Sequence, residues 1–188
     1  MTNQAAVLDA NVLIPENLGS FLATCAYTGC FTPVLSTLAL DEVIRNFPIA
    51  KKRMRKMESA FAEYFVTPNP QLIASINLSK SPEDAHIVAA AITSSANVIV
   101  TNDSDLILEV NERTDLEFVA LYPFEFLLST IQQDSEKVCE AVKLTAQMRK
   151  KPNQWTTAQV IESLVDIGRP SNQEFIKYLT SVLAKDSS

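Results

Sequence analysis

The chain has 188 residues, of which 47% are hydrophobic and 20% are charged, and its net charge is −6. This length and composition suit one α/β domain with a modest appendage and exclude a largely disordered protein. The acidic balance argues against nonspecific binding to a polyanion, unless metal ions neutralise clustered carboxylates.

The cysteines and the single histidine restrict the chemistry further. Three cysteines with no CxxC pair disfavour a disulfide framework or a cysteine zinc site, and we expect a reducing cytoplasm. The only histidine, His86, is expected on the outer surface of its helix, which disfavours the hydrolase triads that need a histidine base. No pattern predicts a signal peptide or membrane span, so we expect a cytoplasmic protein without a membrane partner.

The first half of the chain predicts strands and helices in alternation. Residues 5–8 form a short apolar run that predicts a buried strand, and Asp9 follows it directly. A helix from residue 16 should stop at Gly29, and residues 31–34 predict a second strand. Ser36 is suited to cap a helix over 37–46, and a basic helix is expected over 51–65.

The next segment repeats this alternation. Ser81 and Pro82 predict the start of an alanine-rich helix that continues to about residue 95. Strands are expected at 98–101 and 116–120, with a polar turn at 102–105 and a helix at 124–131. Such alternation predicts a central, mostly parallel sheet with helices on both faces, and its functional crevice should lie beyond the carboxyl ends of the strands.

From about residue 132 the pattern predicts helices only, at 135–150, 156–167 and 171–184. We therefore divide the chain into an α/β domain, residues 1–131, and an all-helical C-terminal extension, residues 132–188.

Five acidic residues follow strands or occupy helix starts and faces in the α/β domain. They are Asp9, Glu42, Asp84, Asp103 and Asp105. Oxygen ligands of this kind suit Mg²⁺ or Mn²⁺, ions that promote phosphodiester hydrolysis. The sequence therefore offers a candidate metal site at the edge of the sheet.

Each acid also has an ordinary structural interpretation. Asp9 can form an Asx-turn, and Glu42 can pair with the arginine three residues later. Asp84 can serve only the helix start, and Asp103 with Asp105 can cap the following helix. The joint order of the acids, rather than any one of them, carries the metal-site hypothesis.

That order resembles the PIN-domain nucleases, especially the VapC-like toxins of bacterial toxin–antitoxin pairs. The similar segments are VLDANVL, LSTLALDEVIRN, SPEDAHIVAAAITSSANVIVTNDSDL and YPFEFL, and they cover roughly residues 5–130. The resemblance implies a three-layer α/β/α sandwich and a quartet of metal-binding catalytic acids.

By this resemblance, the residues fall into a quartet, one additional metal-binding acid and two supporting polar residues. The quartet is Asp9, Glu42, Asp84 and Asp103, the additional acid is Asp105, and the supporting residues are Asn11 and Thr101.

A basic run lies at the start of the predicted helix over 51–65. It comprises Lys51, Lys52, Arg53, Arg55 and Lys56. These residues could guide an RNA backbone toward the acids, or they could form an ordinary solvated helix face.

The resemblance implies an Mg²⁺- or Mn²⁺-dependent endoribonuclease, the toxin of a type II pair. Its implied partners are an RNA substrate, a small DNA-binding antitoxin and, as a homodimer, a second copy of the chain. The alternatives are a catalytically inactive binding or scaffold protein of the same fold, or a metal-dependent DNA nuclease or phosphatase.

Overall fold

The computed structural model describes residues 4–148, 155–165 and 170–186. The chain divides into two compact units, each made of two segments. Unit 1 comprises Met1–Glu16 and Phe31–Pro123, and unit 2 comprises Asn17–Cys30 and Phe124–Ser188.

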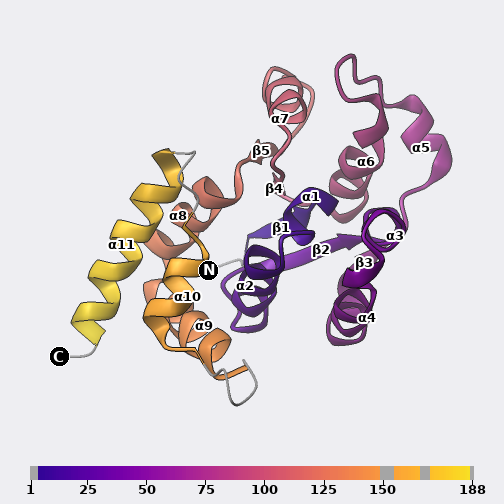
Figure 1. Ribbon diagram of the computed structural model, residues 1–188. Helices are drawn as coiled ribbons and strands as arrows, with labels where there is room; N and C mark the ends of the chain where they lie inside the picture. Colours follow the sequence, from indigo (N-terminus) through magenta and orange to yellow (C-terminus); the bar gives the residue numbers. More distant parts are fainter. Residues whose placement is uncertain (1–3, 149–154, 166–169, 187–188) are drawn as a thin grey trace. The chain divides into compact units, whose positions relative to one another are not determined.

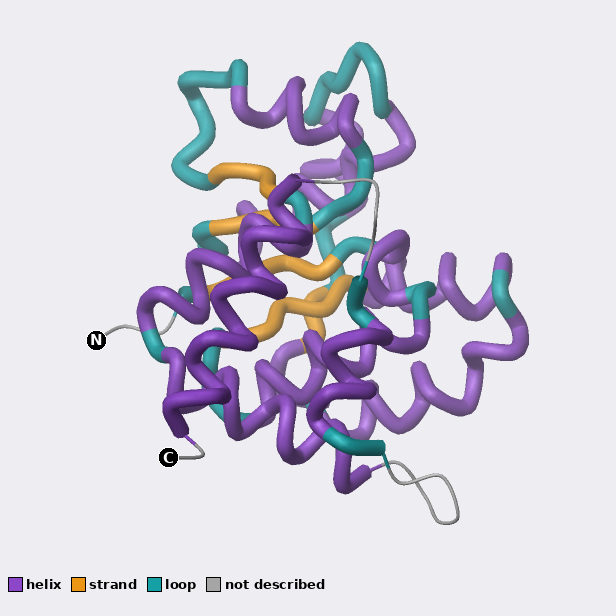
Figure 2. Tube along the Cα trace, turned by 60° about the vertical axis from the view of Figure 1, so that its left-hand side comes forward, coloured by secondary structure: helices purple, strands orange, loops and turns teal. Residues whose placement is uncertain are grey.

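Unit 1 is built on a five-stranded sheet in which all neighbouring strands are parallel (Figures 1 and 2). The strands are β1 (Ala5–Leu8), β2 (Thr32–Ser36), β3 (Phe65–Val66), β4 (Val98–Val100) and β5 (Val119–Leu121). Residues of β1 and β4 are almost fully buried, which explains their continuous apolar sequences.

The strand order is β3-β2-β1-β4-β5, so β1 lies at the centre. The chain moves outward from β1 through β2 to β3 and then returns to the other side of β1 at β4. This reversal creates a switch point at the carboxyl ends of β1 and β4, the place where open α/β sheets form their crevices.

Short helices surround this edge and cover the sheet of unit 1 (Figure 1). The α-helices are α1 (Ala10–Leu13), α3 (Thr37–Asn46), α4 (Lys51–Ala60), α5 (Pro70–Ser75), α6 (Ala85–Ser94) and α7 (Ser104–Asn111). Three 3₁₀ turns are η1 (Pro48–Ala50), η2 (Ala62–Tyr64) and η3 (Pro82–Asp84). Helix α6 packs across β1, β2, β3 and β4, and small alanine side chains allow this close approach.

The free edge of the sheet at β5 is closed by a side chain. Asn111, the last residue of α7, accepts a hydrogen bond from the backbone N–H of Ala120 at 2.8 Å. Its amide nitrogen donates to the carbonyl of the same residue at 2.9 Å. The side-chain amide thus satisfies the outward backbone groups in the middle of this edge strand.

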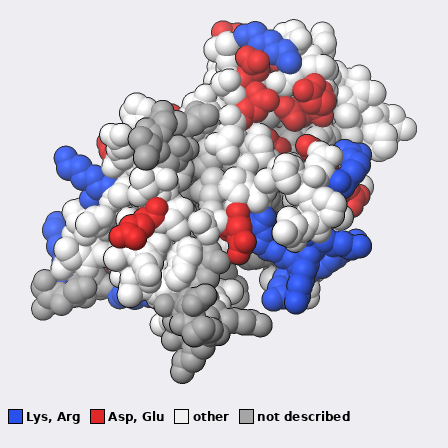
Figure 3. All heavy atoms as spheres, in the orientation of Figure 1, with Lys and Arg blue, Asp and Glu red and all other residues white. Residues whose placement is uncertain are grey.

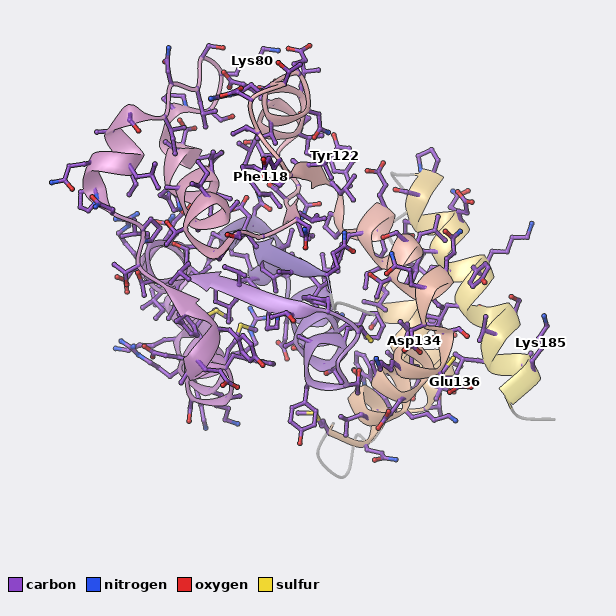
Figure 4. The ribbon with its side chains drawn as sticks, turned by 180° about the vertical axis from the view of Figure 1, so that it is seen from behind. Lys80, Phe118, Tyr122, Asp134, Glu136 and Lys185 are labelled. Carbon is purple, nitrogen blue, oxygen red and sulfur yellow. The ribbon has the colours of Figure 1, made fainter. Side chains whose placement is uncertain are left out.

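Unit 2 is helical. Its helices are α2 (Glu16–Tyr27, whose first residue belongs to unit 1), α8 (Pro123–Gln133), α9 (Ser135–Met148), α10 (Thr157–Ser163) and α11 (Pro170–Asp186). Phe175 is fully buried and its ring lies 6.3 Å from that of Phe21 and 5.9 Å from that of Phe124. Asp134, labelled in Figure 4 between α8 and α9, forms an ion pair with Lys137 at 3.1 Å.

The predicted fold class is confirmed: a central parallel sheet with flanking helices is followed by C-terminal helices. The basic helix is shorter than predicted, because it ends at Ala60 and the chain then forms η2 and β3. Residues Phe65 and Val66 pair with Leu35 and Ser36, and this long-range pairing overrides the local helical pattern. The short helices α1 and α5 were not predicted.

Other boundaries differ by a few residues. The predicted ends of two tail helices, at residues 149–150 and 166–167, lie outside the described residues. The domain boundary at residue 131 stays a prediction. In the described parts of the chain, every helix is too short or too polar to cross a membrane.

Candidate active site at the carboxyl ends of β1 and β4

Asp9 is held rigidly at the end of β1. Its side chain is buried, with 3% of the residue exposed. One carboxylate oxygen accepts a hydrogen bond from the backbone N–H of Ala10 at 2.6 Å, and the other accepts one from the Thr101 hydroxyl at 2.7 Å. Asp9 therefore caps α1 through the N–H of the next residue, rather than through that of Asn11 as in the expected Asx-turn, and it is also part of a polar cluster.

The Thr101 hydroxyl connects three segments of this edge. It donates to Asp9 and accepts hydrogen bonds from the Asn11 side-chain amide and the Asp103 backbone N–H, both at 3.0 Å. Asn11 in turn accepts from the backbone N–H of Asn102 at 2.8 Å. Thr101 and Asn11 thus join the turn after β4 to the turn after β1.

Asp103 caps helix α7. One of its oxygens accepts hydrogen bonds from the backbone N–H groups of Asp105 and Leu106, at 2.7 and 3.0 Å. This arrangement satisfies two N–H groups of the first turn and fixes the orientation of the carboxylate. Asp105 is exposed, and among the described residues no contact joins its carboxylate to the other four acids.

Asp84 shows that the four predicted acids share one environment. Burial raises the pKa of Asp84 to about 7, and the negative charges of Asp9, Asp103 and Glu42 contribute to the shift, together with that of its neighbour Glu83. Among the described residues, no lysine or arginine forms an ion pair with any of the four carboxylates. In the described parts of the chain, His86 is the only basic side chain close to this cluster, with its Nε2 4.0 Å from a carboxylate oxygen of Glu42.

The pKa of Asp9 is also raised. Burial is the main cause and nearby Glu42 adds to it, while the hydrogen bonds from Thr101 and Ala10 act in the opposite direction. Asp9 therefore combines a costly location for a charge with donors that fix its geometry.

His86 lies near these acids, so the expectation that it is a surface residue was wrong. Only 13% of its side chain is exposed, and its Nε2 lies 4.0 Å from a carboxylate oxygen of Glu42. His86 lies one helical turn before Ala90, which is fully buried, so this face of α6 packs inward rather than toward solvent.

Ser36 was expected to cap α3, and it does occupy the N-cap position. Its hydroxyl, however, makes no capping hydrogen bond. It is 1% exposed and has no hydrogen-bond partner among the described residues. Leu35 is in register with Leu8, so Ser36 and Asp9 are the residues that directly follow this last pair of β2 and β1.

The chemical nature of these side chains fits a bound divalent cation. The four acids supply oxygen ligands, their mutual repulsion calls for a counter-ion, and two buried polar atoms, Ser36 Oγ and His86 Nε2, have no described partner. As they stand, no three acidic, histidine or cysteine side chains of the described residues are grouped tightly enough to hold a metal.

The basic run divides into residues with and without structural partners. The Arg53 guanidinium donates to the carbonyls of Ile14 at 2.8 Å and Pro15 at 3.4 Å, and Arg55 pairs with Glu58 at 2.6 Å. Lys51, Lys52 and Lys56 are exposed. Figure 3 shows basic side chains over α4 and acidic side chains over α7 on the same face.

Comparison with known proteins gives one match. A family model described as the PIN domain matches residues 5–105, just over half of the chain. The match includes the four acids and their supporting residues. No curated protein matches the chain. No solved structure matches it either.

Proposed function

This chain belongs to the PIN-domain family, whose members are in general metal-dependent nucleases, and from that premise we propose that it is an Mg²⁺- or Mn²⁺-dependent endoribonuclease. In this proposal Asp9, Glu42, Asp84 and Asp103 are the catalytic, metal-binding residues. Asp105, which is exposed, is at most an additional ligand.

The observation that carries the proposal is the shared environment of the four acids. A cation held there would activate water and stabilise the charge on the phosphate oxygens. Asp9 is fixed by Thr101 and Ala10, so it presents its carboxylate in one orientation. The raised pKa of Asp84, about 7, reflects the repulsion among these acids, which a bound cation would relieve by favouring the ionised form.

RNA is the proposed substrate on two grounds. The motifs around the acids resemble those of the VapC-like toxins, and α4 displays exposed lysines beside α3, the helix that carries Glu42. Lys51, Lys52 and Lys56 are suited to phosphate contacts, because their ammonium groups are not committed to described ion pairs. Arg53 is less suited, since its guanidinium already binds backbone carbonyls.

The same resemblance supports a biological setting. We propose a cytoplasmic toxin that is inhibited by a small DNA-binding antitoxin and that forms a homodimer. Co-expression with the product of an adjacent small gene would test the partner, and light scattering would test the dimer.

A substrate panel tests the proposed reaction. Single-stranded RNA, structured RNA, DNA flaps and an aryl phosphate should be incubated with Mg²⁺, with Mn²⁺ and with EDTA. We expect cleavage of RNA only in the presence of metal. Cleavage in EDTA would contradict a metal-dependent enzyme, and a preference for the DNA flap or the aryl phosphate would redirect the proposal to those substrates. Binding of RNA without any cleavage would favour the inactive scaffold.

A further inference from the structure

The imidazole of His86 is held in a defined orientation by the backbone. Its Nδ1 lies 2.8 Å from the carbonyl oxygen of Glu83. A carbonyl can only accept, so Nδ1 carries the hydrogen of this bond. In the neutral ring, the other nitrogen, Nε2, then has a lone pair available.

That lone pair lies in the acidic cluster without a partner. Nε2 is buried and has no hydrogen-bond partner among the described residues. Its distance of 4.0 Å from Glu42 is too long for a hydrogen bond. Two ligands of one cation, each about 2.1 Å from the ion, can have this separation.

A second buried group supports a ligand here. Ser36 Oγ, 1% exposed and without a described partner, is at the end of β2, directly after Leu35, which is in register with Leu8, the residue before Asp9. A polar atom buried without a partner is costly, and such atoms are usually satisfied by water or an ion. Ser36 and His86 come from different elements, β2 and α6, and both belong to the edge that holds the acids.

We propose that His86 Nε2 is a nitrogen ligand of the cation at this site, and that it makes the site prefer Mn²⁺ to Mg²⁺. This inference rests on the proposed function. Mg²⁺ takes oxygen ligands almost exclusively, whereas first-row transition metals gain from an imidazole ligand. The hydrogen bond from Nδ1 to a backbone carbonyl is the support that metal-binding histidines commonly have.

A purely structural role is the alternative. The bond to Glu83 would satisfy Nδ1 and fix the first turn of α6, and a protonated ring would pair Nε2 with Glu42 at 4.0 Å. An imidazolium of this kind would give no ¹⁴N coupling to bound Mn²⁺.

The experiment uses untagged full-length protein in a buffer without nitrogen ligands. His86 is the only histidine of the chain, so a ¹⁴N imidazole coupling on bound Mn²⁺ can come only from this residue. Electron spin-echo spectroscopy of the Mn²⁺-loaded protein should show this coupling. Mn²⁺ titration and competition by Mg²⁺ give the ratio of the two dissociation constants.

Two variants separate the nitrogens. His86→Asn can keep the donor to the Glu83 carbonyl but lacks Nε2, and His86→Gln can place an amide oxygen near the position of Nε2. We expect both to lose the ¹⁴N coupling. His86→Asn should weaken Mn²⁺ binding by about tenfold or more. His86→Gln should retain more affinity and lose most of the preference for Mn²⁺. Thermal unfolding checks that each variant is folded.

The outcomes distinguish this inference from the proposed function. Wild-type protein that binds Mn²⁺ without ¹⁴N coupling, or His86→Asn with an unchanged ratio of dissociation constants, would overturn the role of His86 and leave the metal-dependent nuclease intact. If Mn²⁺ does not bind to the wild type at all, both the metal site and the role of His86 fail.

Discussion

Glu109 and the acidic cluster that includes Asp84, both in unit 1, have opposite electrostatic surroundings. Glu109 accepts hydrogen bonds from the Ser79 hydroxyl at 2.8 Å, the Lys80 backbone N–H at 3.1 Å and the Ser79 backbone N–H. Although burial acts to raise it, these donors hold the pKa of Glu109 below its usual value. Asp84, in the same unit, has its pKa raised to about 7 by burial and by other acids.

The difference separates acids that stabilise the fold from acids that are kept for a ligand. Glu109 joins α7 to the loop before η3, and its charge is balanced by donors. The acids at the ends of β1 and β4 repel one another, and the fold tolerates this cost. Residues that oppose stability in this way are typical of functional sites.

The largest expected effect is on RNA cleavage, and it distinguishes Asp9, in the acidic cluster, from Glu109. Asp9→Asn should reduce RNA cleavage by at least about a hundredfold, more than the loss usual for outer partners of a metal ligand. Glu109→Gln should leave activity within about twofold, because Glu109 is a structural acid. Initial rates with Mn²⁺ measure both, and circular dichroism checks folding. An active Asp9→Asn protein would remove Asp9 from the catalytic set.

The next effect concerns the support of Asp9. Thr101→Val keeps the side-chain shape but removes the hydroxyl that donates to Asp9 and accepts from Asn11 and Asp103. We expect a loss of about 1–3 kcal/mol in unfolding free energy and a ten- to hundredfold loss of activity. Thr101→Ser should restore most of both. If Thr101→Val were as active and stable as wild type, the hydroxyl would not organise the site.

A smaller effect concerns Asp84, whose ionised carboxylate lowers the unfolding free energy of the protein instead of raising it. With its folded-state pKa raised, Asp84 costs no stability below about pH 4, where it is protonated in both states. Between pH 4 and pH 7 the unfolded chain ionises first, so the unfolding free energy falls as pH rises, and above pH 7 the full cost is present.

Asp84→Asn should therefore stabilise the metal-free protein at pH 8 while lowering activity. After allowance for solvent screening we expect about 1 kcal/mol, or a rise of roughly 3 °C in Tm, and almost no change at pH 4. Thermal unfolding at the two pH values measures this. A lower Tm for Asp84→Asn at pH 8 would show that repulsion does not dominate at this residue.

The smallest effect concerns the basic helix. Lys52→Glu with Lys56→Glu should weaken RNA binding and reduce the dependence of log Kd on log salt by about two phosphate contacts. Lys177→Glu with Lys185→Glu makes the same charge change in unit 2 and is the control. Fluorescence anisotropy at several salt concentrations gives both slopes. Equal slopes for the two double variants would assign α4 to an ordinary solvated surface.

Sequence alone was sufficient for the parts of the site that depend on local rules. Asp9 and Thr101 follow apolar strands, and parallel strands bring their ends to one edge, so their proximity was predictable. Glu42 is partly buried, whereas its neighbour Asp41 is exposed.

Other parts depend on geometry that no local pattern contains. The position of His86 depends on which face of the alanine-rich helix α6 packs inward, and apolar residues lie on several of its faces. The burial of Ser36 depends on packing around the end of β2, which involves contacts far apart in sequence. The structural bonds of Arg53 could not be separated from its basic neighbours by charge alone.

The amide of Asn111 has a consequence for assembly. In a parallel strand alternate residues face opposite neighbours, and Val119 and Leu121 already bond to the β4 side. Ala120 is the residue of β5 that faces outward, and Asn111 occupies both of its backbone groups. An incoming strand from another chain thus finds no unpaired donor or acceptor at the middle of this edge. A strand of a second copy or of an inhibitor therefore cannot extend the sheet through the middle of β5, and this edge is protected from growing into aggregates.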